Sequence, residues 1–171
     1  MPCTIVIALL LAVALNVGIK GTGLFRTFIF FPNISSMVAV GIVWSMIFHP
    51  TRGPLNLFLS HIGVSNPPQW LVSSSTALLS VMIVAVWKQA GYYMVIILAG
   101  LQSIPKQLYE AAEIDGANGL KRFFHITLPM LSPTMFMVTI LSLISSFQVF
   151  DLISIMTEGG PGRATNVLVY R

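Results

Sequence analysis

Long apolar stretches alternate with short polar ones along most of this chain. Four apolar windows, at 3–19, 28–48, 76–101 and 130–156, have or approach the length of a membrane-spanning helix. Such a helix needs about 20 apolar residues to cross a bilayer core of about 30 Å. We therefore predict an all-α polytopic transmembrane helical bundle with about four spans, forming a single domain over residues 1–171.

The polar segment 102–129, between the third and fourth windows, departs most from this pattern. Pro105 suits the first turn of a helix, and Ala111 and Ala112 keep that helix thin enough to enter a groove. We expect Glu110 and Glu113 to lie on or near one side of this helix. The segment is typical of a docking element.

A bend comes after this first helix. Asp115 and Gly116 supply a turn, and glycine permits it without a Cβ clash. Asn118 can then cap a second short helix, which Pro129 separates from the fourth apolar window. The apolar residues of this second helix recur at helical spacing: Leu120, Phe123, Phe124 and Leu128.

These residues resemble the cytoplasmic signature of bacterial ABC-importer permeases. The match consists of EAA at 110–112, glycine four residues after the second alanine, and Ile-x-Leu-Pro at 126–129. Its flanks resemble the carbohydrate branch, of the maltose and glycerol-phosphate permease type: Leu98 to Pro105, Phe150-Asp151, Gly159-Gly160-Pro161, Leu24 to Thr27, Pro32, Trp44 and Gly53 to Asn56.

The resemblance implies the permease subunit of an ATP-driven, binding-protein-dependent sugar importer. Its partners would be an ATP-binding subunit dimer, a second permease subunit and an extracytoplasmic solute-binding protein. ATP and Mg would be bound by the ATPase, with no cofactor on this chain. The implied ATPase-coupling residues are Glu110, Ala111, Ala112, Asp115, Gly116, Phe123, Leu128 and Pro129, with Phe123, Phe124 and Leu128 holding the second helix against the membrane domain.

Composition supports a membrane protein, because 56% of the residues are apolar and only 8% are charged. The net charge of +4 does not indicate nucleic acid, since the basic residues form no stripe interleaved with aromatic residues. Cys3 is the only cysteine, so no internal disulfide can form.

Basic residues gather in the first and third loops: Lys20, Arg26, Lys106, Lys121 and Arg122. The loop 49–75 holds only Arg52, so the positive-inside rule places 102–129 in the cytoplasm. Arg163, in the outward turn, is the main departure from this bias. The family implies a bacterial inner membrane as the location, with a multi-pass chain.

The outward loop contains a predicted interfacial helix that starts at Pro54 and ends near Gly63. Its apolar residues have helical spacing: Leu55, Phe58, Leu59 and Ile62. Such a helix either anchors the loop at the membrane surface or contacts an external binding protein.

Catalytic chemistry is not indicated. No phosphate-binding Gly-x-x-x-x-Gly-Lys-Ser/Thr loop occurs, and Gly159 to Gly162 lacks the lysine. His49, His61 and His125 are too scattered for a metal site. We predict no catalytic residue, no metal ligand and no enzymatic activity.

Four residues are candidates for a substrate path: Lys88, Phe147, Gln148 and Asp151. An ionisable group in a span is costly unless it faces a cavity, a partner or the interface. Lys88 therefore lines the path, snorkels or pairs with the second permease, and Asp151 lines the path or caps an interface. Phe147 and Gln148 combine an aromatic face with an amide, which suits a sugar.

Alternatives remain for the chain as a whole. The first window could be a secretory signal with Ala12-Val-Ala14 as its cleavage site, although no basic residue precedes it. Permeases of this type have about six spans, so the sequence is expected to be a partial chain. Other possibilities are a permease for amino acids, peptides or ions, and a non-transporting scaffold or fragment. A secondary transporter is disfavoured by the span count and the missing ion relay.

Overall fold

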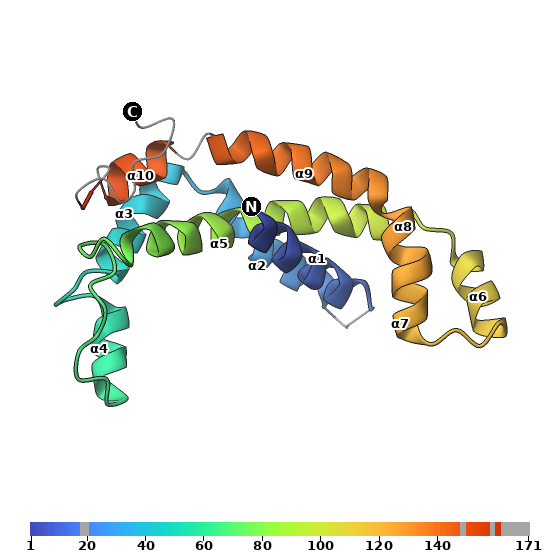
Figure 1. Ribbon diagram of the computed structural model, residues 1–171, viewed down its shortest axis with the longest axis horizontal. Coiled ribbons are helices and arrows are strands. Elements are labelled where there is room, and N and C mark those ends of the chain that lie inside the picture. The colour runs from blue at the N-terminus through green and yellow to red at the C-terminus, as the bar shows by residue number, and fades with distance from the viewer. Residues whose placement is uncertain (18–20, 148–149, 158–159, 162–171) are drawn as a thin grey trace. The chain divides into compact units, whose positions relative to one another are not determined.

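The computed structural model describes residues 1–17, 21–147, 150–157 and 160–161, and this part of the chain is helical without strands. The helices, shown in Figure 1, are α1 (Pro2–Asn16), α2 (Thr22–Ile34), α3 (Met37–Ile47), α4 (Pro54–His61), α5 (Ala77–Gln102), α6 (Lys106–Ile114), α7 (Gly119–Arg122), the π-helical turn η1 (Phe123–Thr127), α8 (Leu128–Met130), α9 (Ser132–Phe147) and α10 (Phe150–Met156). The predicted all-α class is confirmed.

Two units divide the chain. The first comprises Met1–Asn33 and Gln89–Leu143, and the second comprises Ile34–Lys88 and Ile144–Arg171. Helix α5 supplies residues to both, because its 26 residues cross the boundary after Lys88.

The first unit buries a core built from α1, α5 and the start of α9. Core positions recur every three or four residues, as expected for packed helix faces: Ala8, Ala12, Leu15, Tyr93, Met94, Ile97, Leu98, Leu101, Ile104, Leu131 and Val138. Gly91 lies against the backbone of α2, since a Cβ there would collide with the carbonyl oxygen of Ile29. This close approach explains the glycine in the middle of a long apolar helix.

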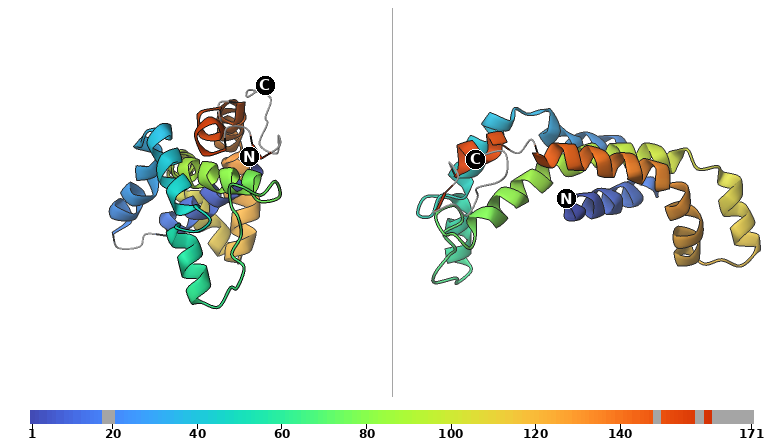
Figure 2. Two further views of the ribbon diagram at one scale, coloured as in Figure 1. Left: turned by 90° about the vertical axis from the view of Figure 1, so that its left-hand side faces the viewer. Right: turned by 45° about the horizontal axis from the view of Figure 1, so that its top comes forward.

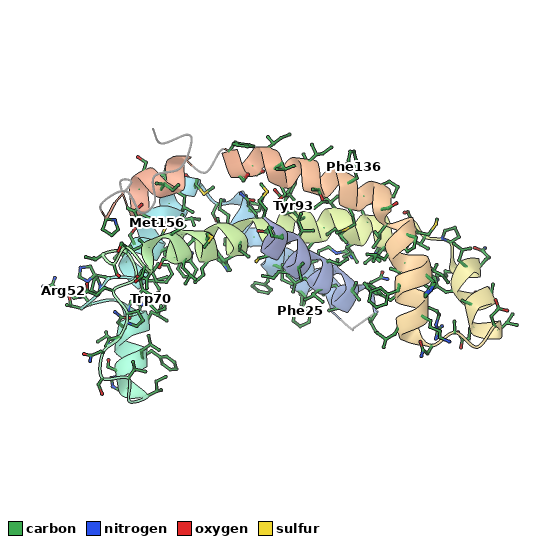
Figure 3. The ribbon with its side chains drawn as sticks, viewed as in Figure 1. Phe25, Arg52, Trp70, Tyr93, Phe136 and Met156 are labelled. Atoms are coloured by element: carbon green, nitrogen blue, oxygen red, sulfur yellow. The ribbon has the colours of Figure 1, made fainter. Side chains whose placement is uncertain are left out.

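Other faces of the first unit expose large apolar side chains. Along α2 they are Leu24, Phe25, Phe28 and Phe31. On α9, Phe136 is 69% exposed and points away from α5 (Figure 3). So much exposed apolar surface suits contact with lipid or with another subunit rather than with water.

The second unit has its own apolar core, in which α3, α5 and α10 meet: Val40, Phe48, Val81, Val84, Leu152, Ile153 and Met156. Gly41 permits α10 to approach α3, because its added Cβ would lie 3.0 Å from Ile155 Cγ2. The loop 49–75 is fastened by Asn56, which is 4% exposed. Its amide donates to the carbonyl oxygens of Pro50 and Pro68 at 2.9 and 3.1 Å, and its Oδ1 accepts from Trp70 Nε1 at 2.7 Å.

The predicted outer helix forms as α4, with Pro54 in its first turn and Gly63 following it at a φ of +94°. Phe58 and Ile62 are largely exposed. Its position at a membrane surface stays a prediction.

The second apolar window, which was predicted as one span, does not form one continuous helix. Instead α2 and α3 meet at a bend of 98°, with the break at Ser35 and Ser36. Hydropathy measures only the apolar length of a window, and a helix break leaves that unchanged.

Among the described residues, one helix, α5, has the length and composition of a span. The number of candidate spans rises to three if each bent pair of helices counts as one span. The two pairs are α2 with α3 and the Gly119–Met130 segment with α9, and the second pair bends by 64°. The first window forms α1, an apolar helix of 15 residues. The fourth window is divided between α9 and α10. The four-span arrangement stays a prediction.

Candidate functional site

The segment 102–129 folds into two antiparallel arms joined by a tight bend, and α6 lies beside α7 in all the ribbon views (Figures 1 and 2). We call α6 the first arm and the run from α7 to α8 the second arm. Both belong to the first unit.

The first arm begins after Pro105, whose extended backbone (φ −60°, ψ 129°) places it at the N-cap, one residue before the position predicted. Proline fits the entry of a helix, because the amide proton that it lacks would have no partner within the helix there. None of the residues of α6 is buried. Glu110 and Ala111 are exposed, and Ala112 is half-buried toward the second arm.

The two glutamates do not share one role on this helix. Glu113 turns toward the second arm, where its Oε2 accepts from Arg122 Nη1 at 3.1 Å. Glu110 is exposed, and among the described residues the ion pair is formed by Glu113. The spacing of three residues keeps the two carboxylates near one side of the helix, as expected, and the ion pair of Glu113 is what distinguishes them.

The bend is a Schellman motif. The amide of Ala117 donates to the carbonyl of Ala112 at 2.9 Å, and the amide of Gly116 donates to that of Glu113 at 3.0 Å. Asp115 is the C-cap residue of α6, and Gly116 after it has a φ of +71°. That left-handed conformation explains why the bend needs glycine.

The second arm starts as predicted at Asn118, whose Oδ1 accepts the amide of Lys121 at 2.9 Å. It then widens into a π-turn, in which the amide of Leu128 donates to the carbonyl of Phe123. Pro129 has no amide proton and its ring crowds the carbonyl four residues earlier, so the wider turn accommodates it. Pro129 lies inside α8, and the helix continues to Met130, which corrects the predicted end.

The apolar residues of the second arm have unequal surroundings. Phe123 and Leu128 are half-buried, and Phe123 lines a cavity of about 260 Å³ together with Val13, Val17 and Leu101. Phe124 is 58% exposed, with its ring edge-on to Phe123, so it does not pack this arm against the core of the first unit. That part of the prediction was wrong.

A second cavity, of about 360 Å³, separates the two arms. Its lining combines two alanines and an isoleucine with charged and polar side chains, and most of the lining surface is apolar: Ala112, Asp115, Ala117, Lys121, Arg122, His125 and Ile126. The predicted residues Ala112 and Asp115 are therefore brought together here.

Two side-chain hydroxyls, one on each arm, form a further connection between the arms. Tyr109 Oη and Thr127 Oγ1 share a hydrogen bond of 2.9 Å, and Thr127 is 7% exposed. Neither residue, nor Arg122 as a partner of Glu113, was among the predicted site residues. One feature of the sequence could have indicated Thr127: it is a polar residue inside the apolar run 126–129, and a buried hydroxyl needs a hydrogen-bond partner.

The proposed path residues lie elsewhere. Lys88 is 6% exposed in the second unit, and its Nζ donates to the carbonyl oxygen of Ser35 at 2.6 Å. Ser35 lies in the break between α2 and α3, where the helical hydrogen-bond ladder is interrupted. Lys88 therefore supplies a donor to a carbonyl at this break.

The other three residues predicted for the substrate path are Phe147, Gln148 and Asp151. Phe147, at the end of α9, is 57% exposed. Gln148 lies outside the described residues, as does the side chain of Asp151, whose backbone belongs to α10. The grouping of these residues with Lys88 into a substrate path stays a prediction.

Comparison with known proteins identifies the chain. Residues 4–169 match the family model described as binding-protein-dependent transport system inner membrane component. The chain belongs to this family. The match includes both arms of 102–129, in agreement with the permease resemblance of the sequence motif.

Individual permeases of this family are similar over almost the whole chain. The sn-glycerol-3-phosphate transport system permease protein UgpA of Agrobacterium fabrum is 39% identical over 166 residues, covering 96% of this chain and 56% of the relative. The trehalose/maltose transport system permease protein MalF of Thermococcus litoralis is 39% identical over 160 residues, covering 94% and 54%. The chain thus spans about half the length of these curated relatives.

A solved structure agrees with the fold. The crystal structure of a bacterial ABC transporter that imports the acidic polysaccharide alginate matches with a TM-score of 0.79 and 26% identity, covering 93% of this chain and 56% of that one. The helical arrangement described above is therefore a permease fold of an ABC importer.

Proposed function

We propose that this chain is a permease subunit of an ATP-driven, binding-protein-dependent carbohydrate importer in a bacterial inner membrane. Membership of the inner-membrane component family supports the class of protein. The substrate class is supported by the names of its relatives, which transport glycerol phosphate, trehalose and maltose, and by the alginate importer. Its spans would contribute to the translocation path.

The proposed coupling role rests on the exposure of the first arm. Helix α6 buries none of its residues, and Ile114 at its end is 87% exposed. An apolar side chain so exposed beside a polar bend is typical of a surface that a partner covers. We propose that α6 enters a cleft of the ATP-binding subunit, with the exposed Glu110 meeting a basic group there.

Mechanical transmission would result from this docking. Closure of an ATPase dimer moves its cleft, the first arm moves with it, and the motion passes to the second arm and the membrane helices. ATP and Mg²⁺ would be held by the ATPase, so this chain would supply no catalytic group. The proposed cytoplasmic side of the loop rests on Lys106, Lys121 and Arg122.

A second permease subunit and an external solute-binding protein complete the proposed assembly. The alginate transporter has been crystallised in complex with a periplasmic protein carrying an alginate pentasaccharide, which supports the latter partner. The exposed apolar faces of α2 and α9 offer surface for lipid or for the companion permease.

The decisive experiment measures uptake and ATP hydrolysis by the full-length chain reconstituted with its companion subunits. We expect uptake of a labelled sugar or sugar phosphate that requires both ATP and the binding protein. Glu110→Lys should lower uptake at least about tenfold, because a charge reversal at a desolvated contact costs more than about 1.4 kcal/mol. Ser65→Lys, which introduces the same side chain at an exposed position of the loop 49–75, is the control.

Two results would contradict the proposal. Normal uptake by Glu110→Lys would remove the docking role of that carboxylate. ATP-dependent uptake of amino acids, peptides or ions without uptake of any carbohydrate would place the chain in another importer class.

A further inference from the structure

The two arms are fastened to each other at two points besides the bend that connects them. One is the hydrogen bond of 2.9 Å between Tyr109 Oη and Thr127 Oγ1, and the other is the ion pair of 3.1 Å between Glu113 and Arg122. Tyr109 and Glu113 are four residues apart on α6, so they lie on one face of that helix. This face is turned to the second arm and leaves Glu110 and Ala111 exposed.

The hydrogen bond is the stronger of the two fastenings. Thr127 is 7% exposed, and its hydroxyl also donates to the carbonyl oxygen of Arg122 on its own arm, at 3.5 Å. Loss of Tyr109 as a partner therefore leaves this buried hydroxyl with only a long hydrogen bond, which carries a desolvation cost. Glu113 is 74% exposed, so water and salt screen its attraction to Arg122. The ion pair aligns the arms, and the hydroxyl pair holds them.

Thr127 connects the fastening to the membrane helices. It is the last residue of the π-turn, and α8 and the start of α9 come directly after it. Leu131, between α8 and α9, is fully buried in the core of the first unit. A force on α6 can therefore reach that core across the hydrogen bond without passing through the glycine bend.

We infer that Tyr109 and Thr127, assisted by Glu113 and Arg122, are positioning residues that make the two arms one rigid lever. Without them the covalent connection between α6 and the second arm is the turn at 115–118, in which nothing lies within 4 Å of a Cβ added at Gly116. Motion of the ATPase would then be absorbed by the bend. This inference rests on the proposed coupling function.

The first test is a distance measurement that needs no transport activity. Spin labels are placed on Cys substituted at Gln107 and at Lys121, one exposed residue on each arm, in the full chain with Cys3→Ser, in lipid nanodiscs. Tyr109→Phe and Thr127→Val should each broaden the distance distribution and raise the separated population about fivefold, as expected for the net loss of one hydrogen bond. Their combination should add nothing further, because either change removes the same bond.

The second test measures ATP hydrolysed per sugar transported by the assembled complex. Both variants should raise this ratio while ATP hydrolysis itself is retained. Thr139→Val is the matched control, since Thr139 is exposed on α9 and bonds only its own helix, to the carbonyl of Met135 at 2.7 Å. Glu113→Arg should raise the ratio slightly, and adding Arg122→Glu should restore it.

Unchanged distance distributions in both hydroxyl variants would overturn the inference whatever the complex transports. Broader distributions with an unchanged hydrolysis ratio would also overturn it, because the arms would then move independently without cost to coupling. If wild-type complexes transport no sugar, the proposed function fails, and the distance measurement still decides whether the arms are fastened.

Discussion

Gly116 offers a clean test of the bend, because its substitution should act through the backbone alone. Its φ is +71°, and no atom lies within 4 Å of the position that an added Cβ would take. A side chain therefore meets no neighbour, and the whole cost is the strain of a left-handed backbone. That cost is about 1–2 kcal/mol for alanine and larger for β-branched valine.

Gly119 provides the matched control. It too has nothing within 4 Å of an added Cβ, but its φ is not in the left-handed region. It is the first residue of α7, where alanine is the better helix former. Gly119→Ala should therefore leave the loop unchanged or stabilise it slightly.

Hydrogen exchange of the Ala117 amide reports directly on the bend, since this amide is bonded to the carbonyl of Ala112 at 2.9 Å. A loss of about 1–2 kcal/mol corresponds to exchange that is about 5 to 30 times faster in Gly116→Ala. Gly116→Asn should change less, because asparagine tolerates the left-handed region, and Gly116→Val should change more. In the assembled importer, Gly116→Val should hydrolyse ATP with little uptake while the chain still inserts into the membrane.

Equal exchange in Gly116→Ala and the wild type would refute this reasoning. So would an equal effect of alanine at Gly116 and at Gly119, because the two sites differ in backbone conformation and not in available space.

Three further substitutions test other parts of the structure. Gly91→Ala should lower thermal stability by about 1–3 kcal/mol or more, since its Cβ would collide with the backbone of Ile29; an unchanged unfolding temperature would contradict the close approach. Lys88→Met should cost about 1–3 kcal/mol by removing the donor to Ser35, as measured by unfolding in detergent; a more stable variant would show that the lysine does not hold the break. Asn118→Ala should lose about 1 kcal/mol and speed exchange at the start of α7, whereas aspartate should preserve the cap; equal exchange in both variants would exclude the cap.

Local signals determined the parts of the fold that sequence analysis placed well. The third apolar window was predicted at 76–101, and α5 runs over Ala77–Gln102, because a long uninterrupted apolar run has few alternatives to a helix. The bend at Gly116 and the cap at Asn118 were also predictable, since turn and cap preferences act between residues close in sequence.

Errors arose where a boundary depends on the surroundings. The second window contains Pro32 within α2, yet the chain turns later, at Ser35 and Ser36. At the end of the second arm, Pro129 is accommodated by a π-turn and does not stop the helix. A proline limits which hydrogen bonds can form, but the packing of its neighbours selects among the remaining solutions.

The sequence by itself determined a helical membrane chain of the permease type, with a docking loop whose bend is set by glycine and asparagine. Only the tertiary structure decided which polar groups meet. Tyr109 reaches Thr127 across 18 positions, and Lys88 reaches Ser35 across 53. Apolar periodicity and turn preference are encoded by neighbouring residues, whereas a hydrogen bond between distant residues exists only after the helices that carry them have packed.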